Sequence, residues 1–122
     1  MPLDEILPND LRAPREARHA VARFLARAEL PQLIDDAQLL VSELVTNAVR
    51  HARGPIAVRA QVRDGFLHLE VGDCVPDCGP EPREARAEDE GGRGMELVEK
   101  LSARWGWQVT DHAKVVWIDL RV

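Results

Sequence analysis

Three polar side chains recur at every fourth position in one stretch of the chain: Glu43, Asn47 and His51. A glutamate carboxylate can orient or deprotonate a nucleophile. An asparagine amide oxygen suits an octahedral Mg²⁺ that keeps most of its waters and bridges phosphates. On a helix, residues four apart differ by about 40° around the axis and about 6 Å along it. The spacing therefore predicts one stripe of side chains that could serve a magnesium–phosphate site.

The apolar residues of the same stretch predict the helix that carries this stripe, from Asp35 to His51. They are Ala37, Leu40, Val41, Leu44, Val45, Ala48 and Val49. At about 100° per residue they occupy one broad arc that faces a core, and the polar stripe follows one border of that arc. Pockets form at such borders. A half-buried border also tolerates polar residues that have no function, so this helix alone does not establish a site.

Two further features add to the stripe. Asp73 ends a predicted strand, and the run Gly91-Gly92-Arg93-Gly94 leads directly into a predicted helix. Peptide N–H groups that glycine leaves accessible at a helix N-terminus hold phosphate oxygens, because the helix dipole favours anions there. Arg93 could reach a phosphate as well. Together, the stripe, the aspartate and the glycines indicate a nucleotide site.

Hydrophobic periodicity predicts the elements that must position these residues. In chain order we expect an N-terminal arm or edge strand within 1–13, helices over 14–29 and 35–51, strands over 56–62 and 67–73, a helix from about 95, and strands over 107–110 and 115–122. The loop over 74–91 is long and rich in proline and acidic residues. This order predicts an α+β two-layer sandwich, with helices on one face of a mixed, mostly antiparallel sheet.

Length, charge and composition limit the classes of protein to which the chain can belong. A length of 122 residues predicts a single domain over 1–122. A net charge of −5 argues against non-specific nucleic-acid binding as the main task, and we expect no direct nucleic-acid partner. No apolar run approaches the roughly 20 residues of a membrane span, and the N-terminus lacks the pattern of a secretory signal, so we expect a cytoplasmic protein without a membrane partner. Cys74 and Cys78 are too few for a disulfide scaffold and lack a second pair for zinc, which favours two reduced thiols.

Some residues outside the stripe have structural interpretations. Trp105, Trp107 and Trp117 are expected to pack between the sheet and the helices rather than to stack on a base. Lys114, at the edge of a predicted strand, is expected to face solvent. A contact from Lys114 to a phosphate or to the loop over 74–91 is the alternative.

Three motifs carry a resemblance to a known family. ELVTNAVRHA, VGD and GGRGMELV are similar, in this order and spacing, to the N, G1 and G2 boxes of the histidine-kinase-like ATPase superfamily, the Bergerat fold. Within that superfamily the chain resembles the single-domain anti-sigma-factor serine/threonine kinases over nearly its whole length. The G1 box departs from the usual Asp-x-Gly-x-Gly, because Val75 and Asp77 stand where the glycines would be.

The resemblance implies ATP and Mg²⁺ as cofactors and a role for each motif residue. It implies that Glu43 is the catalytic base or polariser, that Asn47 is the Mg²⁺ ligand, and that Asp73 is the partner of the adenine amino group. His51 would support the N box, and the loop over 74–91 would be the ATP lid. The remaining residues, which would bind phosphate or lie beside it, are Gly92, Arg93, Gly94 and Met95.

The resemblance also implies an activity. It suggests a kinase that transfers the γ-phosphoryl group of ATP to a small anti-sigma-factor antagonist protein and binds a sigma factor or similar regulator. The related kinases often act as homodimers. The altered G1 box supports a different hypothesis, a nucleotide-dependent module that binds a regulator with little or no phosphotransfer. A sensor histidine kinase is disfavoured, because the chain has no room for a dimerisation helix with a phosphoacceptor histidine.

Overall fold

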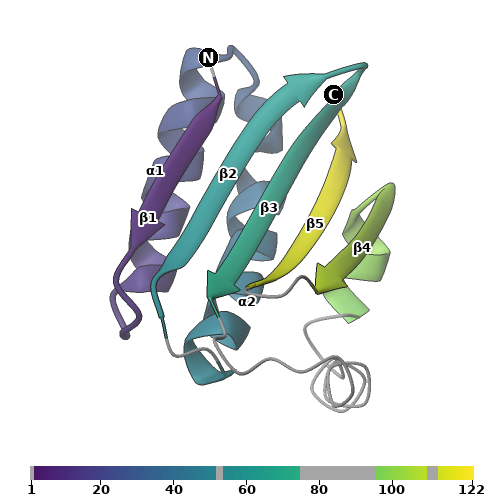
Figure 1. The fold of residues 1–122 in the computed structure, drawn as a ribbon. Coiled ribbons are helices and arrows are strands. Elements are labelled where there is room, and N and C mark those ends of the chain that lie inside the picture. The colour runs from purple at the N-terminus through teal and green to yellow at the C-terminus, as the bar shows by residue number, and fades with distance from the viewer. Residues whose placement is uncertain (1, 52–53, 75–95, 110–112) are drawn as a thin grey trace.

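The computed structural model describes residues 2–51, 54–74, 96–109 and 113–122. Within these residues, five strands form one sheet, and the helices cover one of its faces (Figure 1). The elements are β1 (Leu3–Leu7), α1 (Ala13–Arg27), the 3-10 helix η1 (Pro31–Leu33), α2 (Ile34–His51), β2 (Ile56–Arg63), β3 (Phe66–Cys74), a helical segment over 96–101, β4 (Arg104–Val109) and β5 (Ala113–Arg121). The predicted two-layer α+β sandwich is confirmed.

The strand order is β1-β2-β3-β5-β4, and each neighbouring pair is antiparallel. The expected mixed sheet is therefore antiparallel throughout its described ladders. β1 lies at one edge, where the expectation for residues 1–13 allowed either an arm or an edge strand. In the described part of the chain, no helix combines the length and apolar composition needed to cross a membrane.

The end of α1 differs from the prediction by about two residues. The helix ends at Arg27 rather than at Glu29, because Glu29 adopts a left-handed φ of 61°. The N–H of Glu29 donates to Ala26 O (3.1 Å), and the N–H of Leu30 donates to Leu25 O (2.9 Å). These two bonds form a Schellman motif, which satisfies the last carbonyls and turns the chain toward η1.

The core lies between the two helices and the inner face of the sheet. Six of the seven predicted apolar positions of α2 are buried, and Val49 is partly buried against the same cluster. The buried side chains of α2 are Ala37, Leu40, Val41, Leu44, Val45 and Ala48. They meet alternate residues of the central strands, among them Val58, Leu69 and Ile118, which are also fully buried. The apolar residues that recur with period 3.6 on the helix and with period 2 on the strands therefore pack into one cluster.

The open face of the sheet holds one of the three tryptophans. Trp105 packs against the core, and Trp107 pairs with Val116 on the helix side. Trp117 precedes the buried Ile118 by one residue and therefore points to the opposite face, where its ring stacks on His68 with centroids 5.7 Å apart. The expectation that it packs between sheet and helices was wrong, because Val115–Ile118 are apolar on both faces and the sequence does not show which of them face the core.

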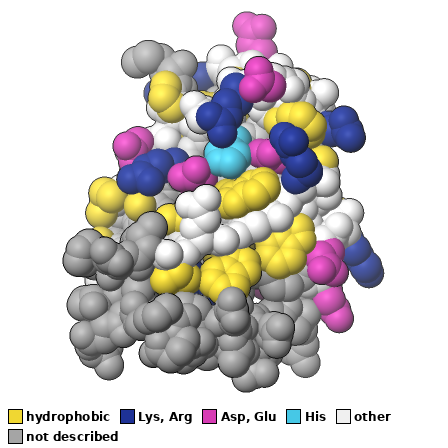
Figure 2. All heavy atoms as spheres, turned by 45° about the vertical axis from the view of Figure 1, so that its right-hand side comes forward, with side chains coloured by type: hydrophobic (Ala, Val, Ile, Leu, Met, Phe, Trp, Pro, Cys, Tyr) yellow, Lys and Arg dark blue, Asp and Glu magenta, His cyan; other side chains and the backbone are white. Residues whose placement is uncertain are grey.

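A polar network surrounds this histidine on the open face (Figure 2). The two ring nitrogens of His68 lie 2.6 Å from Asp119 Oδ1 and 3.0 Å from Glu70 Oε2. Arg104 approaches the other carboxylate oxygen of Asp119 at 2.9 Å. Asp119 is only 6% exposed, so these partners satisfy a carboxylate that would be costly to bury alone.

Close packing on the same face also constrains the neighbouring strand. Gly106 lies opposite Trp117 in the β4–β5 ladder. A Cβ at Gly106 would lie 2.8 Å from Cζ2 of the Trp117 ring and 3.0 Å from two further ring atoms. These distances leave no space for a side chain while the indole keeps its stacked position.

Two adjacent leucines of α2 test the assignment of its core face. Leu40 is fully buried and Leu39 is 42% exposed. We expect Leu40→Ala to lower the free energy of unfolding by about 2–5 kcal/mol, because it removes buried methyl groups and leaves a cavity. Leu39→Ala, the same change on the same helix, should cost less than about 1 kcal/mol. Urea denaturation measures both, and equal losses would contradict the assigned face.

Candidate functional site

Chain connectivity brings the predicted site elements to one end of the sheet. α2 ends at His51, and β2 begins five residues later at Ile56. Ile56 pairs with Asp73 near the end of β3, and Asp73 pairs in turn with Lys114 near the start of β5. Figure 1 shows the end of α2, the end of β3 and the start of β5 at the same end of the molecule. The polar stripe of α2 therefore runs toward the backbone of Asp73.

Glu43 and Asn47 lie one turn apart on α2, and both are half-buried. Within the described residues, neither side chain forms a hydrogen bond or an ion pair. The other polar border of α2 differs: Gln38 donates to Arg18 O at 3.0 Å, and Ser42 accepts from Arg18 at 3.1 Å. The polar residues that face α1 are thus paired within the protein. A half-buried amide and carboxylate that have no partner among the described residues are candidates for contact with a ligand.

These two side chains fit the chemistry of a magnesium nucleotide. An amide oxygen at Asn47 can take one position of an octahedral Mg²⁺, since the ion obtains its other ligands from waters and phosphate oxygens. The carboxylate of Glu43, one turn back along α2, can accept a proton or orient a hydroxyl. Of the third stripe residue, His51, the structure describes only the backbone, as the last residue of α2.

Lys114 adds a cation to this end of the sheet. It pairs with Asp73 and Val109, and it lies two residues before Val116, which packs against the core, so it points to the helix side. Its ammonium lies 5.6 Å from the centroid of the Trp107 ring, and the side chain is half-buried. The expectation of a solvent-facing lysine was therefore wrong. The sequence held no clear signal for its face, because the residues that follow it, Val115–Ile118, are all apolar.

Several predicted site residues lie outside the part of the chain that the structure describes. These are Gly92, Arg93, Gly94, Met95, the lid residues 75–91, and the side chains of Asp73 and Cys74. The structure does describe the helical segment over 96–101 that follows the glycines. Val98 is fully buried there, and Leu97 and Leu101 pack against the core. These contacts fix the helix into which the glycine run leads.

Comparison with known proteins agrees with this arrangement. The chain matches the family described as histidine kinase-like ATPase domain over residues 7–120. None of the curated proteins compared with the chain matches it. The match spans nearly the whole chain and includes the stripe, Asp73 and the glycine run. The protein therefore belongs to the histidine kinase-like ATPase domain family, and this membership implies that it binds ATP.

Thermal unfolding with Mg-ATP tests the nucleotide site. At a ligand concentration about 100 times Kd, binding to the native state alone adds about 2.7 kcal/mol, a rise of several degrees in Tm for a domain of this size. We expect this rise in the wild-type protein, a smaller rise with ATP plus chelator, and its loss in Asp73→Asn, which removes the carboxylate from the β3 end.

Asp64→Asn is the matched control, because it makes the same chemical change at the other end of the β2–β3 hairpin. Asp64 has a φ of 55°, a conformation that asparagine also tolerates. The control should keep the full Mg-ATP shift. Equal shifts in both variants would place the adenine contact elsewhere.

Proposed function

We propose that the protein is an anti-sigma-factor serine/threonine kinase that uses Mg-ATP to phosphorylate a small anti-sigma-factor antagonist protein in the cytoplasm. The observation that carries the proposal is the pair Glu43 and Asn47, half-buried one turn apart and unpaired within the described residues. Family membership supports ATP as the phosphoryl donor. The resemblance of the three boxes to those of anti-sigma-factor kinases supports the class of substrate.

The proposed reaction needs few groups, because phosphoryl transfer depends mainly on position and charge. The substrate hydroxyl oxygen forms a bond to the γ-phosphorus as the bond from that phosphorus to the β–γ bridging oxygen breaks. Glu43 takes the hydroxyl proton, and ADP leaves with the bridging oxygen. Asn47 would hold Mg²⁺, which would neutralise charge on the phosphates. A serine or a threonine hydroxyl serves equally in this scheme.

The remaining roles come from the resemblance. Asp73 would accept a hydrogen bond from the adenine amino group, and His51 would support the N box. The residues that would bind the phosphates, through backbone N–H groups or an adjacent side chain, are Gly92, Arg93, Gly94 and Met95. The half-buried Lys114 supplies further positive charge at the same sheet end. A sigma factor or similar regulator is the second partner in this proposal, and a homodimer is the proposed assembly.

One sequence feature favours a second candidate function. Val75 and Asp77 replace the glycines that would let the backbone after Asp73 approach the nucleotide closely. A site altered in this way could bind ATP and present a regulator-binding surface without transferring phosphate. The two functions differ in one product, a phosphorylated antagonist.

Phosphotransfer from labelled ATP to a candidate antagonist separates the two functions. We expect label on serine or threonine with the wild-type protein, and a loss of about 10²–10⁴-fold in the transfer rate with Glu43→Gln, which removes the base but keeps the shape. The Mg-ATP thermal shift should remain in this variant. Glu16→Gln, an exposed glutamate on α1, is the matched control and should transfer normally.

Absence of label with the wild-type protein, together with a normal Mg-ATP thermal shift, would reject the kinase in favour of the binding module. Full activity in Glu43→Gln would instead remove Glu43 from the reaction. Loss of both the thermal shift and transfer in that variant would indicate that the carboxylate contributes to the fold of the site.

A further inference from the structure

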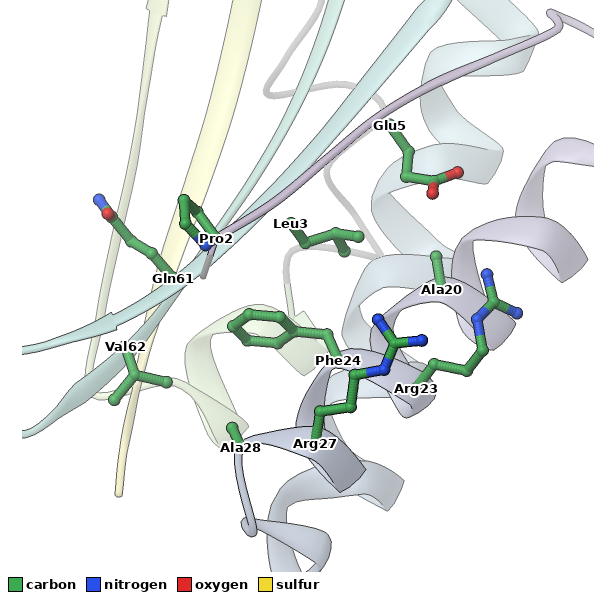
Figure 3. Close-up of a pocket in the computed structure, with 10 residues that line it drawn as sticks. All are labelled: Pro2, Leu3, Glu5, Ala20, Arg23, Phe24, Arg27, Ala28, Gln61 and Val62. Atoms are coloured by element: carbon green, nitrogen blue, oxygen red, sulfur yellow. The ribbon is translucent and has the colours of Figure 1, made fainter.

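A cavity of about 730 Å³ lies at the end of the sheet opposite the nucleotide site. It opens between β1, the last residues of β2 and the C-terminal half of α1 (Figure 3). Its lining residues are Pro2, Leu3, Glu5, Ala20, Arg23, Phe24, Arg27, Ala28, Gln61 and Val62. Since β2 begins at Ile56 beside Asp73 and ends beyond Val62, the length of this strand separates the two sites.

The floor of the cavity is apolar. Leu3 and Phe24 are partly buried and pack against the core, and Ala20 is almost fully buried beneath them. Val62, 42% exposed, forms part of the wall. A single apolar side chain from a partner could cover this surface and remove it from water, which is favourable.

The rim of the cavity carries excess positive charge. Arg23 and Arg27 lie one turn apart on the same side of α1, and both are exposed (Figure 3). Within the described residues, neither forms a hydrogen bond or an ion pair. Glu5 is the one carboxylate among the residues that line the cavity. On a protein of net charge −5, two guanidinium groups beside one carboxylate make a local site for anions.

The neighbouring strand offers a backbone template. Among the residues that the structure describes, β1 pairs only with β2, because the strand order places β1 at the edge of the sheet. An extended chain can add to such an edge through main-chain hydrogen bonds. In an added strand, every second side chain faces the helices, at a spacing of about 6.6–6.8 Å. Arg23 and Arg27 are separated by about 6 Å along α1, a similar spacing.

We propose that this cavity and the free edge of β1 bind an extended acidic peptide segment of a partner protein. The segment pairs with β1 through its backbone. It places two carboxylates, two residues apart, against Arg23 and Arg27, and it inserts an apolar side chain between Leu3 and Phe24. The segment thus alternates, with glutamate or aspartate and an aliphatic residue on the face toward α1. This site is independent of ATP and of the proposed kinase activity.

Fluorescence anisotropy with a labelled probe tests the proposal. The probe is acetyl-Leu-Thr-Glu-Thr-Glu-Thr-Leu-amide, whose leucine at each end allows either strand direction. We expect saturable binding that weakens as salt is added, and at least tenfold weaker binding to the double variant Arg23→Gln/Arg27→Gln. Arg15→Gln/Arg50→Gln, which removes two exposed arginines outside the cavity, should bind as the wild type does. Val62→Glu should weaken binding by placing a carboxylate in the cavity wall.

Two altered probes separate the parts of the proposal. Lysine in place of both glutamates should abolish binding, because the charge then opposes the rim. N-methylation of all backbone amides of the probe should weaken binding at least tenfold, because it removes every donor for β1 in either strand direction. Equal binding of the lysine probe, or unchanged binding to the Arg23/Arg27 variant, would overturn the proposal. Equal binding of the N-methylated probe would overturn the pairing with β1.

A small amphipathic anion is the competing occupant. If laurate binds with the same dependence on Arg23 and Arg27 while the peptide probe does not bind, the site takes a small molecule and the proposal fails. The Mg-ATP thermal shift of the double variant serves as an internal standard. An unchanged shift shows that the fold and the nucleotide site are intact, so that a failed peptide experiment says nothing against the ATP site.

Discussion

The packing of α2 against the inner face of the sheet is the constraint on which the other features depend. Leu40, Val41, Leu44 and Val45 fill the space above the central strands, and they fix the rotation of the helix about its own axis. Once that rotation is fixed, the position of every polar residue of α2 follows. The border with Ser42 turns toward α1 and is paired there, whereas the border with Glu43 stays without a described protein partner. A rotation of one residue, about 100°, would exchange these environments.

Much of this arrangement could be predicted from local pattern. The apolar spacing of residues 37–49 was enough to assign the buried face of α2, and the Asp64-Gly65 turn between two alternating runs was enough for the β2–β3 hairpin. The three boxes pointed to an ATP-binding family, to which the chain belongs. What the pattern could not provide was the phase of β5, since its residues Val115–Ile118 are apolar on both faces. Trp117 and Lys114 were misplaced for that reason.

The same limit applies to the ends of helices and to cavities. Glutamate is not a residue type that signals a left-handed conformation, so the sequence did not predict one at Glu29. The conformation arises because the chain must turn toward η1 while Leu30 packs against the core. The cavity beside β1 is built from residues far apart in sequence, from Leu3 to Val62. The order of the strands in the sheet brings these lining residues together, and the pattern of a single sequence does not show that order.

The contact between Gly106 and the Trp117 indole has an evolutionary consequence. The two residues face each other across the β4–β5 ladder, and a Cβ at position 106 would overlap the ring. A larger residue at position 106 is therefore tolerated only if a smaller residue stands at position 117. Among homologous chains, the size of the residue at 106 and the size of the residue at 117 should vary inversely. Homologues that keep tryptophan at position 117 should almost always have glycine at position 106.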